Sequence, residues 1–347
     1  MKTLFLVQSI TGYGHINRVK TFCDHINDSL ILTKPVFAND TEFFDKFHND
    51  MFVKYIEYNP DIIVTEGFPF GRYSWHSHFN KSLNRHKGIM DILDHAKDKQ
   101  IYSLERDIPW IRPSENWFHS DILNEYYNGI IFHTDDKFIN PKEFIHNQII
   151  DVPLISSSYV TKPIKYNTHR NGYLVSGGDW YPHVEKYYNV ALDVKNRIGG
   201  DWTFIVGDKT SSNLLNRLQK ENVNIVPRPD TNGYRILLAS HELSINQFGA
   251  MSFIDMNVTH TPTIMIPNEL TSNDVYDNNG VIIDKEEHYR AKRYEEIGGG
   301  KVLLIDDVTI DSLTDTIYKV INKKPISFDM NGAKFVREFF NRADTVH

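Results

Sequence analysis

The sequence has a single cysteine, no hydrophobic run long enough to cross a membrane and no excess of basic residues. Cys23 stands alone among 347 residues, so no disulfide can form within the chain, and a reducing compartment is expected. No apolar run reaches the ~18 residues that span a bilayer. The apolar start at residues 4–7 is too short for a signal peptide. These absences predict a soluble, cytoplasmic protein.

The charge balance is acidic, with 45 Asp and Glu residues against 38 Lys and Arg, which gives a net charge of −7. Proteins that coat nucleic acid are usually basic, so the balance argues against that class, although a local basic groove remains compatible with it. A hydrophobic content of 40% is typical of globular proteins. The length exceeds the roughly 250–300 residues at which a single core stops growing, so we expect two domains.

Short apolar runs alternate with longer helical segments, and this rhythm occurs twice along the chain. The apolar positions of the runs are nearly continuous, which is typical of strands buried on both faces of a parallel sheet. Alternating strands and helices predict an open α/β sheet. Strands are expected at residues 3–8, 61–65, 100–104, 128–133, 172–176, 202–206, 223–226, 243–246, 263–266 and 301–305. Helices are expected at residues 16–26, 41–50, 79–96, 183–198, 212–221, 250–257 and 310–321.

The polar, aperiodic segment 161–171 separates the two series and is interpreted as a linker. The fold class is therefore α/β, with two Rossmann-like domains, residues 1–160 and 172–327, facing an interdomain cleft. A last helix is expected within residues 328–347. Its apolar residues share one face and are Phe335, Val336, Phe339 and Phe340. We expect this helix to pack across the domain junction, with an ordinary surface helix as the alternative.

A glycine-containing turn follows the first expected strand. Gly12 and Gly14 allow a tight turn and a close approach of ligand, and the helix that follows offers free N–H groups to an anion. The third glycine of the dinucleotide fingerprint is missing, which argues against a nicotinamide-dependent enzyme. His15 is either a functional group of this turn or a helix cap.

Two further strands of the first series also end in polar residues. Because ligands of open α/β sheets bind outside the carboxyl ends of the strands, these loops are expected to face the crevice that contains His15. One loop contains Glu66, Phe68, Phe70 and Arg72. Its glutamate and arginine could pair with each other or contact a polar acceptor.

The other strand ends in Glu105, Arg106 and Asp107. Two carboxylates around one arginine superficially resemble a clamp for Mg²⁺ or Mn²⁺. Ion pairing with Arg106 explains the triplet without a metal and is the interpretation we favour, so no metal site is expected.

The second series has two turns suited to phosphate. Ser176, Gly177 and Gly178 end a strand and offer hydroxyl and backbone donors to a pyrophosphate. A plain tight turn is the alternative. A sharper motif begins where another strand ends, and it consists of Asn246, Gly249, Ala250, Ser252 and Asp255.

The carboxylate of Asp255 follows Gly249 by six positions and could accept the hydroxyls of a ribose. A run of hydrogen-bonding residues that ends at Asp274 leaves the next strand and suits the hydroxyls of a sugar.

The order of these motifs resembles the two-domain nucleotide-sugar glycosyltransferases of the GT-B fold. The most similar branch contains the N-acetylglucosaminyltransferase of peptidoglycan synthesis and related predicted bacterial glycosyltransferases. The resemblance covers most of the chain. In the first domain the matching residues are Gly12, Gly14, His15, Arg18, Glu66, Gly67, Pro69, Gly71, Arg72, Arg106 and Asp107. In the second domain they are Ser176, Gly177, Gly178, Gly249, Ala250, Ser252 and Asp255.

The resemblance implies a donor site in the second domain and an acceptor site in the first. It implies that Asp255 holds the ribose, with a shorter reach than the Glu of the relatives, and that His15 lies near the reacting centre. A Gln-Gln pair that holds the donor sugar in the peptidoglycan enzyme falls on Asp274 and Val275, so a different donor sugar is expected. Phe248 also replaces a small residue that is usual before Gly249.

The function that follows is a hexosyl- or pentosyltransferase that moves a sugar from a nucleotide-sugar, of UDP type, to an acceptor hydroxyl with inversion. His15 is the expected general base, with Glu66 and Asp107 as the alternatives. Acceptor-side contacts are assigned to Gly12, Gly14, Arg18, Phe68, Phe70 and Arg72. No cofactor or metal is expected, because helix N-termini can stabilise the departing diphosphate.

Other functions stay open at this stage. A nucleotide-sugar hydrolase, a 2-epimerase or a sugar-nucleotide-binding module could share the fold. The acceptor could be a glycan, a lipid-linked sugar, a small molecule or a modified base in DNA. The protein could be a monomer or a homodimer, and it could act at the inner face of a membrane.

Overall fold

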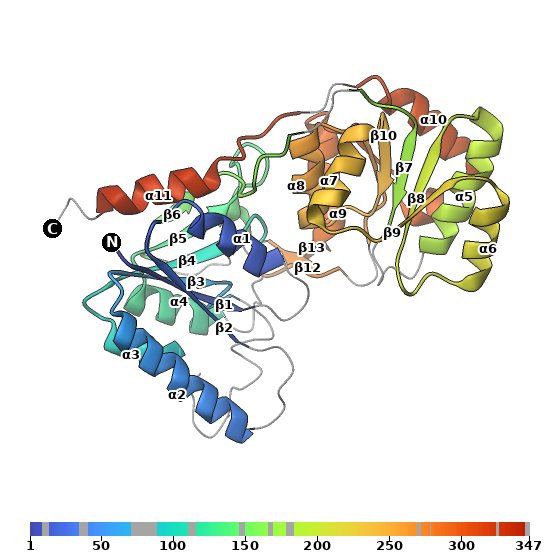
Figure 1. The fold of residues 1–347 in the computed structure, drawn as a ribbon. Helices are drawn as coiled ribbons and strands as arrows, with labels where there is room; N and C mark the ends of the chain where they lie inside the picture. The colour runs from blue at the N-terminus through green and yellow to red at the C-terminus, as the bar shows by residue number, and fades with distance from the viewer. Residues whose placement is uncertain are drawn as a thin grey trace. The chain divides into compact units, whose positions relative to one another are not determined.

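The computed structural model describes residues 1–8, 14–34, 41–70, 89–109, 116–145, 150–165, 169–177, 184–268, 272–277, 279–323 and 326–343. The chain divides into two compact units. Unit 1 consists of Met1–Lys162, Val275–Ile283 and Asp329–His347, and unit 2 consists of Pro163–Asp274 and Asp284–Phe328. Each unit is built on a six-stranded parallel sheet flanked by helices, as the α/β pattern of the sequence predicts (Figure 1).

The sheet of unit 1 has the strand order β2-β1-β3-β4-β5-β6. Its strands are β1 (Thr3–Gln8), β2 (Ser29–Lys34), β3 (Ile62–Glu66), β4 (Gln100–Arg106), β5 (Gly129–His133) and β6 (Leu154–Ser156). Every residue of β3 and β5 is buried, because helices cover both faces of the sheet. The chain passes from β1 to one side and then returns to the other, so the sheet has a topological switch point beside β1.

Alternate residues of β1 enter two separate cores. Leu4 and Leu6 pack with residues of α2 (Thr41–Tyr58), α3 (Ile89–His95) and α4 (Asn116–Tyr126). Phe5 and Val7 point to the opposite face, because successive strand residues alternate in direction. There they pack with residues of α1 (Gly14–Cys23) and α11 (Gly332–Ala343).

The C-terminal helix α11 has the apolar face that the sequence indicates. Val336 and Phe340 are fully buried, and the ring centroid of Phe340 lies 5.3 Å from that of Tyr102 on β4. Gly332 begins the helix against the backbone of Tyr159, where an added Cβ would lie 2.9 Å from the carbonyl oxygen. We expected this helix at the domain junction; its apolar face lies in the core of unit 1, because Val336 and Phe340 complete the sheet face that α1 covers.

The sheet of unit 2 has the order β14-β11-β10-β7-β8-β9. Its strands are β7 (Tyr173–Ser176), β8 (Trp202–Val206), β9 (Asn224–Pro227), β10 (Leu243–Asn246), β11 (Thr263–Met265) and β14 (Lys301–Val302). Its helices are α5 (Val184–Ile198), α6 (Ser212–Lys220), α7 (Thr231–Ser240), α8 (Ala250–Thr259), α9 (Glu286–Glu296) and α10 (Ile310–Val320). A separate hairpin joins β12 (Asp274–Tyr276) to β13 (Ile282–Lys285).

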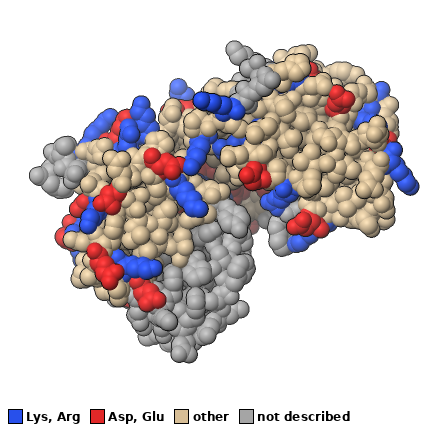
Figure 2. All heavy atoms as spheres, viewed as in Figure 1, with Lys and Arg blue, Asp and Glu red and all other residues tan. Residues whose placement is uncertain are grey.

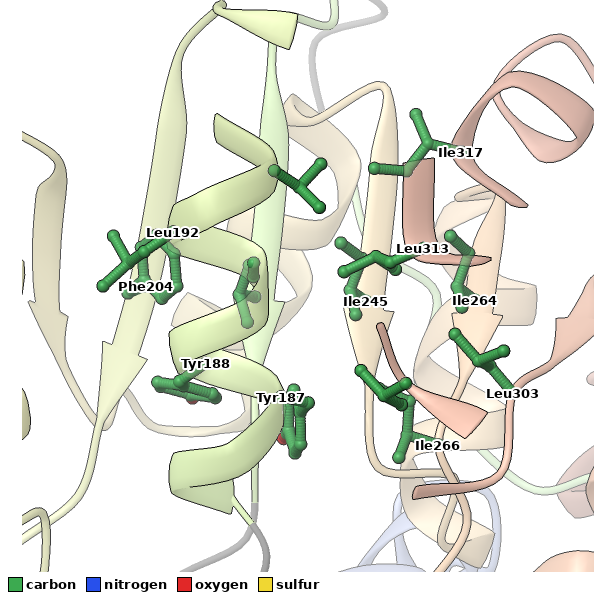
Figure 3. Packing of buried hydrophobic residues seen from close by; sticks show 14 of the residues in the cluster. Tyr187, Tyr188, Leu192, Phe204, Ile245, Ile264, Ile266, Leu303, Leu313 and Ile317 are labelled. Atoms are coloured by element: carbon green, nitrogen blue, oxygen red, sulfur yellow. The ribbon is translucent and has the colours of Figure 1, made fainter. Parts of the chain in front are cut away.

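The core of unit 2 lies between its sheet and the helices α5 and α10. Tyr187 and Leu192 of α5 face Phe204 of β8 and Ile245 of β10, as Figure 3 shows. Leu313 of α10 packs over the same sheet face. This core holds the strands in register and so fixes where their carboxyl ends stand.

Several predicted elements differ in extent from the observed ones. The strand expected at residues 301–305 is β14, which ends at Val302 and is followed by a short 3-10 helix at Ile305–Asp307. The described part of the helix expected at residues 79–96 is α3, and its earlier residues lie outside the described chain. β2, β6, β12, β13, α4, α7 and α9 were not predicted.

Phe340→Ala should lower the free energy of unfolding of unit 1 by about 3–5 kcal/mol, because a fully buried aromatic side chain leaves a cavity. Phe335→Ala on the exposed side of the same helix is the control, with an expected change below about 0.5 kcal/mol. Urea unfolding followed by circular dichroism measures both, and equal losses would show that α11 does not belong to the core.

Candidate functional site

A pocket of about 290 Å³ opens in unit 2 where the carboxyl ends of the central strands meet. Residues that follow β7, β9 and β10 form its wall, which is the edge where parallel α/β sheets bind ligands. The lining residues are Ser176, Gly177, Ile205, Arg228, Pro229, Asp230, Thr231, Tyr234, Gln247, Gly249, Met251, Ser252 and Asp255. The predicted donor-site residues Ser176, Gly177, Gly249, Ser252 and Asp255 are therefore brought together.

The turn after β7 must be glycine at position 177. A Cβ built on Gly177 would lie 2.3 Å from the Tyr187 hydroxyl oxygen and 2.7 Å from a methyl group of Val184. The Tyr187 hydroxyl donates to the carbonyl oxygen of Ser176 at 2.6 Å and fixes the same turn from behind. The backbone can therefore approach a ligand closely at this point.

Helix α8 begins at the pocket wall with Gly249 as its N-cap. Gly249 supplies no side-chain cap, so the first N–H groups of α8 are left to a ligand or to water. The N-terminus of α7 lies at the same pocket, where Asp230 accepts a hydrogen bond from the Gly233 N–H at 2.7 Å. The carboxylate of Asp230 thus caps α7, whereas the uncapped N-terminus of α8 and the Arg228 side chain bring positive potential to the pocket, which suits a phosphate group.

The carboxylate of Asp255 is held by an arginine that the sequence analysis missed. The Nε of Arg235 on α7 lies 2.6 Å from Oδ1 of Asp255 on α8, and each side chain is 6% exposed. Burial raises the pKa of Asp255 to about 6, while the charge and hydrogen bond of Arg235 work against that rise. The one available signal was an arginine in the otherwise apolar stretch at residues 234–239.

A tyrosine hydroxyl completes the polar floor of the pocket. The Tyr234 hydroxyl oxygen lies 3.1 Å from Oγ of Ser176. Burial raises the pKa of Tyr234 above its ordinary range, so this phenol stays protonated at neutral pH. Tyr234 and Ser176 can therefore donate or accept a hydrogen bond at the pocket wall.

Glu287, which the sequence analysis did not single out, ties two loops together beside the pocket. Its carboxylate accepts from Nε2 of Gln247 at 3.1 Å and from the backbone N–H of Asn268 at 2.8 Å. Burial is the main cause that raises the pKa of Glu287. The loops that follow β10 and β11 are thus held by one side chain from α9.

Three predicted donor-site residues do not line the pocket. Asn246 is fully buried, where its amide nitrogen donates to Oγ of Ser244 at 2.7 Å and contacts Sδ of Met256 at 3.2 Å. The side chain of Asn246 therefore belongs to the packing between β10 and α8. Asp274 pairs with Lys285 across the hairpin at 2.6 Å. Ala250 is the first residue of α8 behind Gly249, and Gly178 lies outside the described residues.

In unit 1, Glu66 is paired with Arg18 rather than with the arginine of its own loop. The two side chains are 2.9 Å apart, with 1% and 9% of their surface exposed. Glu66 ends β3 and Arg18 lies on α1, so the ion pair joins the ends of the first and third strands of this sheet. Arg72, the partner considered from sequence, lies outside the described residues.

Glu105 lies beside this ion pair near the end of β4. Its pKa is raised to about 8, chiefly by burial and further by the charge of Glu66, whereas Arg106 and Arg18 oppose the rise. Oγ of Ser103 is 3.2 Å from Oε1 of Glu105. The prediction that Arg106 pairs with the carboxylates beside it stays a prediction, and the charge of Arg106 favours the ionised form of Glu105.

Asp107 is also buried, and its Oδ1 accepts a hydrogen bond from the Ile108 N–H at 2.9 Å. His15 lies in the first turn of α1, directly after Gly14, but its side chain is outside the described set. Gly12 lies outside the described residues as well.

Phe68 and Phe70 were assigned to acceptor-side contacts, and the structure places both side chains in the core. Their side chains are at most 1% exposed and pack with α3 and α4. The loop turns inward at Gly67, whose φ of +78° favours glycine. Hydroxyls of Thr65 and Ser103 donate to the carbonyl oxygen of Phe68 at 2.9 and 2.7 Å and hold it there.

Within the described part of the chain, no three His, Cys, Asp or Glu side chains come together as a metal site would require. No helix among the described residues has the length and apolar character needed to span a membrane. On the face shown in Figure 2, described basic and acidic side chains are interspersed.

No protein-family model matches the sequence. A curated relative is the UDP-N-acetylglucosamine–N-acetylmuramyl-(pentapeptide) pyrophosphoryl-undecaprenol N-acetylglucosamine transferase of Clostridioides difficile (strain 630), 24% identical over 146 residues. The match covers 41% of this chain and 33% of the relative, so this chain spans about a third of the length of the curated relative it matches.

Solved structures match over nearly the whole chain. MurG of Acinetobacter baumannii superposes with a TM-score of 0.59 at 11% identity, covering 99% of this chain and 100% of that one. The UDP-GlcNAc 2-epimerase of Methanocaldococcus jannaschii superposes with a TM-score of 0.61 at 11% identity, covering 98% and 100%. The fold predicted from the order of motifs is confirmed: the chain has the GT-B fold and resembles the branch of nucleotide-sugar glycosyltransferases that contains MurG.

Proposed function

We propose that this protein is a glycosyltransferase that moves a hexose or pentose from a nucleotide-sugar to an acceptor hydroxyl. The observation that carries the proposal is the pocket of unit 2, where the glycine turn at Gly177, the N-terminus of α8 and the carboxylate of Asp255 meet. These are groups suited to a diphosphate and a ribose. The motif resemblance and the curated relative support the same class of reaction.

The parts of the donor are assigned by chemistry. The diphosphate binds the uncapped N–H groups of α8, which carry the positive potential of a helix N-terminus. It also binds the backbone at Gly177, which a ligand can approach closely because no Cβ is present. A ribose hydroxyl donates to the carboxylate of Asp255. The base lies against the Arg228–Thr231 wall, and UDP is the nucleotide that the relative's name favours.

The reaction follows from this placement. The acceptor oxygen attacks the anomeric carbon as the bond from that carbon to the diphosphate oxygen breaks, which inverts the configuration. The acceptor proton passes to a general base, and the diphosphate leaves with the bonding electrons. We assign the base to His15 and keep Glu66 and Asp107 as the alternatives. The uncapped N-terminus of α8 stabilises the leaving group, and we expect no metal requirement.

A nucleotide-sugar 2-epimerase is the second candidate, because a structure of that activity superposes on this chain as well as MurG does. Release or isomerisation of the sugar without an acceptor would favour it, or the related hydrolase. The acceptor of the transferase is a glycan, a lipid-linked sugar, a small molecule or a modified DNA base. A lipid-linked acceptor would place the protein at the inner face of a membrane.

Asp255→Asn should weaken UDP binding by about ten- to a hundredfold, because a hydrogen bond from a ribose hydroxyl to a charged acceptor contributes about 1.5–3 kcal/mol. Asp311→Asn is the matched control, since Asp311 forms an exposed ion pair with Arg197 and does not line the pocket. Calorimetry at pH 7.5 measures both. Unchanged UDP affinity in a folded Asp255→Asn protein would remove this carboxylate from the donor site.

His15→Ala should reduce turnover by about 10²–10⁴-fold and leave UDP affinity nearly unchanged, because a general base acts in the transition state. The assay couples UDP release to transfer and is run in EDTA, where full wild-type activity is expected. If His15 is only a helix cap, the variant keeps its rate and loses about 1 kcal/mol of stability. In that event the base assignment moves to Glu66 or Asp107.

The free energy of unfolding of Glu105→Gln should increase relative to that of the wild type as the pH rises. The carboxyl of Glu105 has a folded pKa of about 8, above the ordinary value of 4.5, so the unfolded chain loses this proton first. Wild-type stability therefore falls between about pH 4.5 and pH 8, and the glutamine removes that loss. Urea titrations at pH 5 and pH 8 test it. If the free energies of unfolding of the variant and the wild type differ by the same amount at both pH values, Glu105 is ionised in the folded protein.

A further inference from the structure

We propose that Arg235 is a positioning residue that sets ribose selectivity in the donor pocket by engaging one carboxylate oxygen of Asp255 and leaving the other for a single ribose hydroxyl. This inference rests on the proposed function, because it assumes that a nucleotide occupies the pocket. It changes what the motif alone suggests, namely a carboxylate that accepts both ribose hydroxyls with both oxygens.

The contacts of Asp255 carry the argument. Its Oδ1 accepts from Nε of Arg235 at 2.6 Å, and its backbone carbonyl accepts from the Thr259 hydroxyl at 2.9 Å. Within the described residues, Arg235 is the one side chain that donates to this carboxylate. Asp255 also lines the pocket, and no described residue donates a hydrogen bond to its Oδ2, so we take Oδ2 as the oxygen that accepts from the ligand.

Burial makes the arginine necessary. A carboxylate that is 6% exposed loses most of its hydration, which favours the neutral acid. Arg235 restores part of the lost stabilisation of the charge, and Nε at this distance restricts the carboxylate to one orientation. Without Arg235 the pKa of Asp255 would rise further and the carboxylate would lose its fixed direction.

The placement of the two residues couples them to the pocket wall. Arg235 lies one residue after Tyr234, whose hydroxyl reaches Ser176, and Asp255 lies one turn after Ser252 on α8. The ion pair therefore joins α7 to α8 next to the pocket-lining residues Tyr234 and Ser252. A shift of either helix would move the ribose acceptor and the diphosphate donors together.

The experiment measures the dissociation constants of UDP and its 2′-deoxy, 3′-deoxy and 2′,3′-dideoxy analogues by calorimetry at pH 8. In the wild type, one of the two monodeoxy analogues should bind about tenfold more weakly than UDP, while the other should bind like UDP. Equal losses for the two analogues would show that Asp255 reads both hydroxyls and would overturn the inference.

The variants are Arg235→Met, Arg235→Lys and the exposed-pair control Arg197→Met. Arg235→Met should weaken UDP about tenfold and leave the dideoxy analogue unchanged, since that analogue has no hydroxyl for Asp255. Arg235→Lys should recover part of the loss. Should Arg235→Met fail to fold, the neutral pair Arg235→Met with Asp255→Asn replaces it, and this double variant should discriminate less between UDP and the dideoxy analogue than the wild type does, because a neutral acceptor contributes less.

The pH dependence separates positioning from a purely structural role. UDP affinity of the wild type should fall below about pH 6, where Asp255 takes up a proton. In Arg235→Met this fall should begin at higher pH, whereas a packing defect would leave its position unchanged and would overturn the inference. Absence of binding by UDP, dTDP and GDP to the wild type would instead overturn the proposed function, so the two failures are distinct.

Discussion

Parallel strand pairing is the constraint on which the candidate site depends. Each crossover helix returns the chain to the same end of the sheet, so every loop that follows a strand emerges at one edge. In unit 2 this brings residues after β7, β9 and β10 to one pocket, although more than 70 residues separate Ser176 from Gly249. In unit 1 the same rule joins Glu66, Glu105 and Arg18. The apolar core of each unit holds the strands in register and so keeps the residues at this edge in place.

Burial determines how the acidic residues at these edges can act. Glu105, Asp255 and Glu287 each have a raised pKa, and burial is the largest cause in every case. The charged groups next to each carboxyl then set how far its pKa rises. Asp255 has Arg235 and keeps a pKa near 6, whereas Glu105 lies beside Glu66 and is held near 8. Arg18 forms its ion pair with Glu66, and the charge of Glu66 adds to the rise in the pKa of Glu105.

The sequence predicts the parts of the fold that depend on local pattern. Continuous apolar runs locate β1, β3 and β10, because both of their faces are covered. Gly177 and Gly249 could be found because turns and helix starts have their own residue chemistry. Helix α9 could not, since it is a strongly polar segment whose buried Arg290 forms an ion pair with Glu286. Arg235 and Glu287 were missed for a related reason: their partners are distant in sequence, and no local pattern encodes a spatial pair.

A shared fold leaves the reaction undetermined, because the proposed donor pocket can serve transfer, hydrolysis or epimerisation. All three require a bound diphosphate leaving group, and the groups proposed to hold it lie in unit 2. The three reactions must therefore differ in the group that reacts with the sugar after the diphosphate leaves and in the base that takes the proton. Phe68 and Phe70 are in the core, so they provide no apolar surface for an acceptor. Under the proposed function, selection of the acceptor therefore depends on other residues of unit 1, at the end of a sheet where the buried Arg18–Glu66 ion pair fixes the polar side chains.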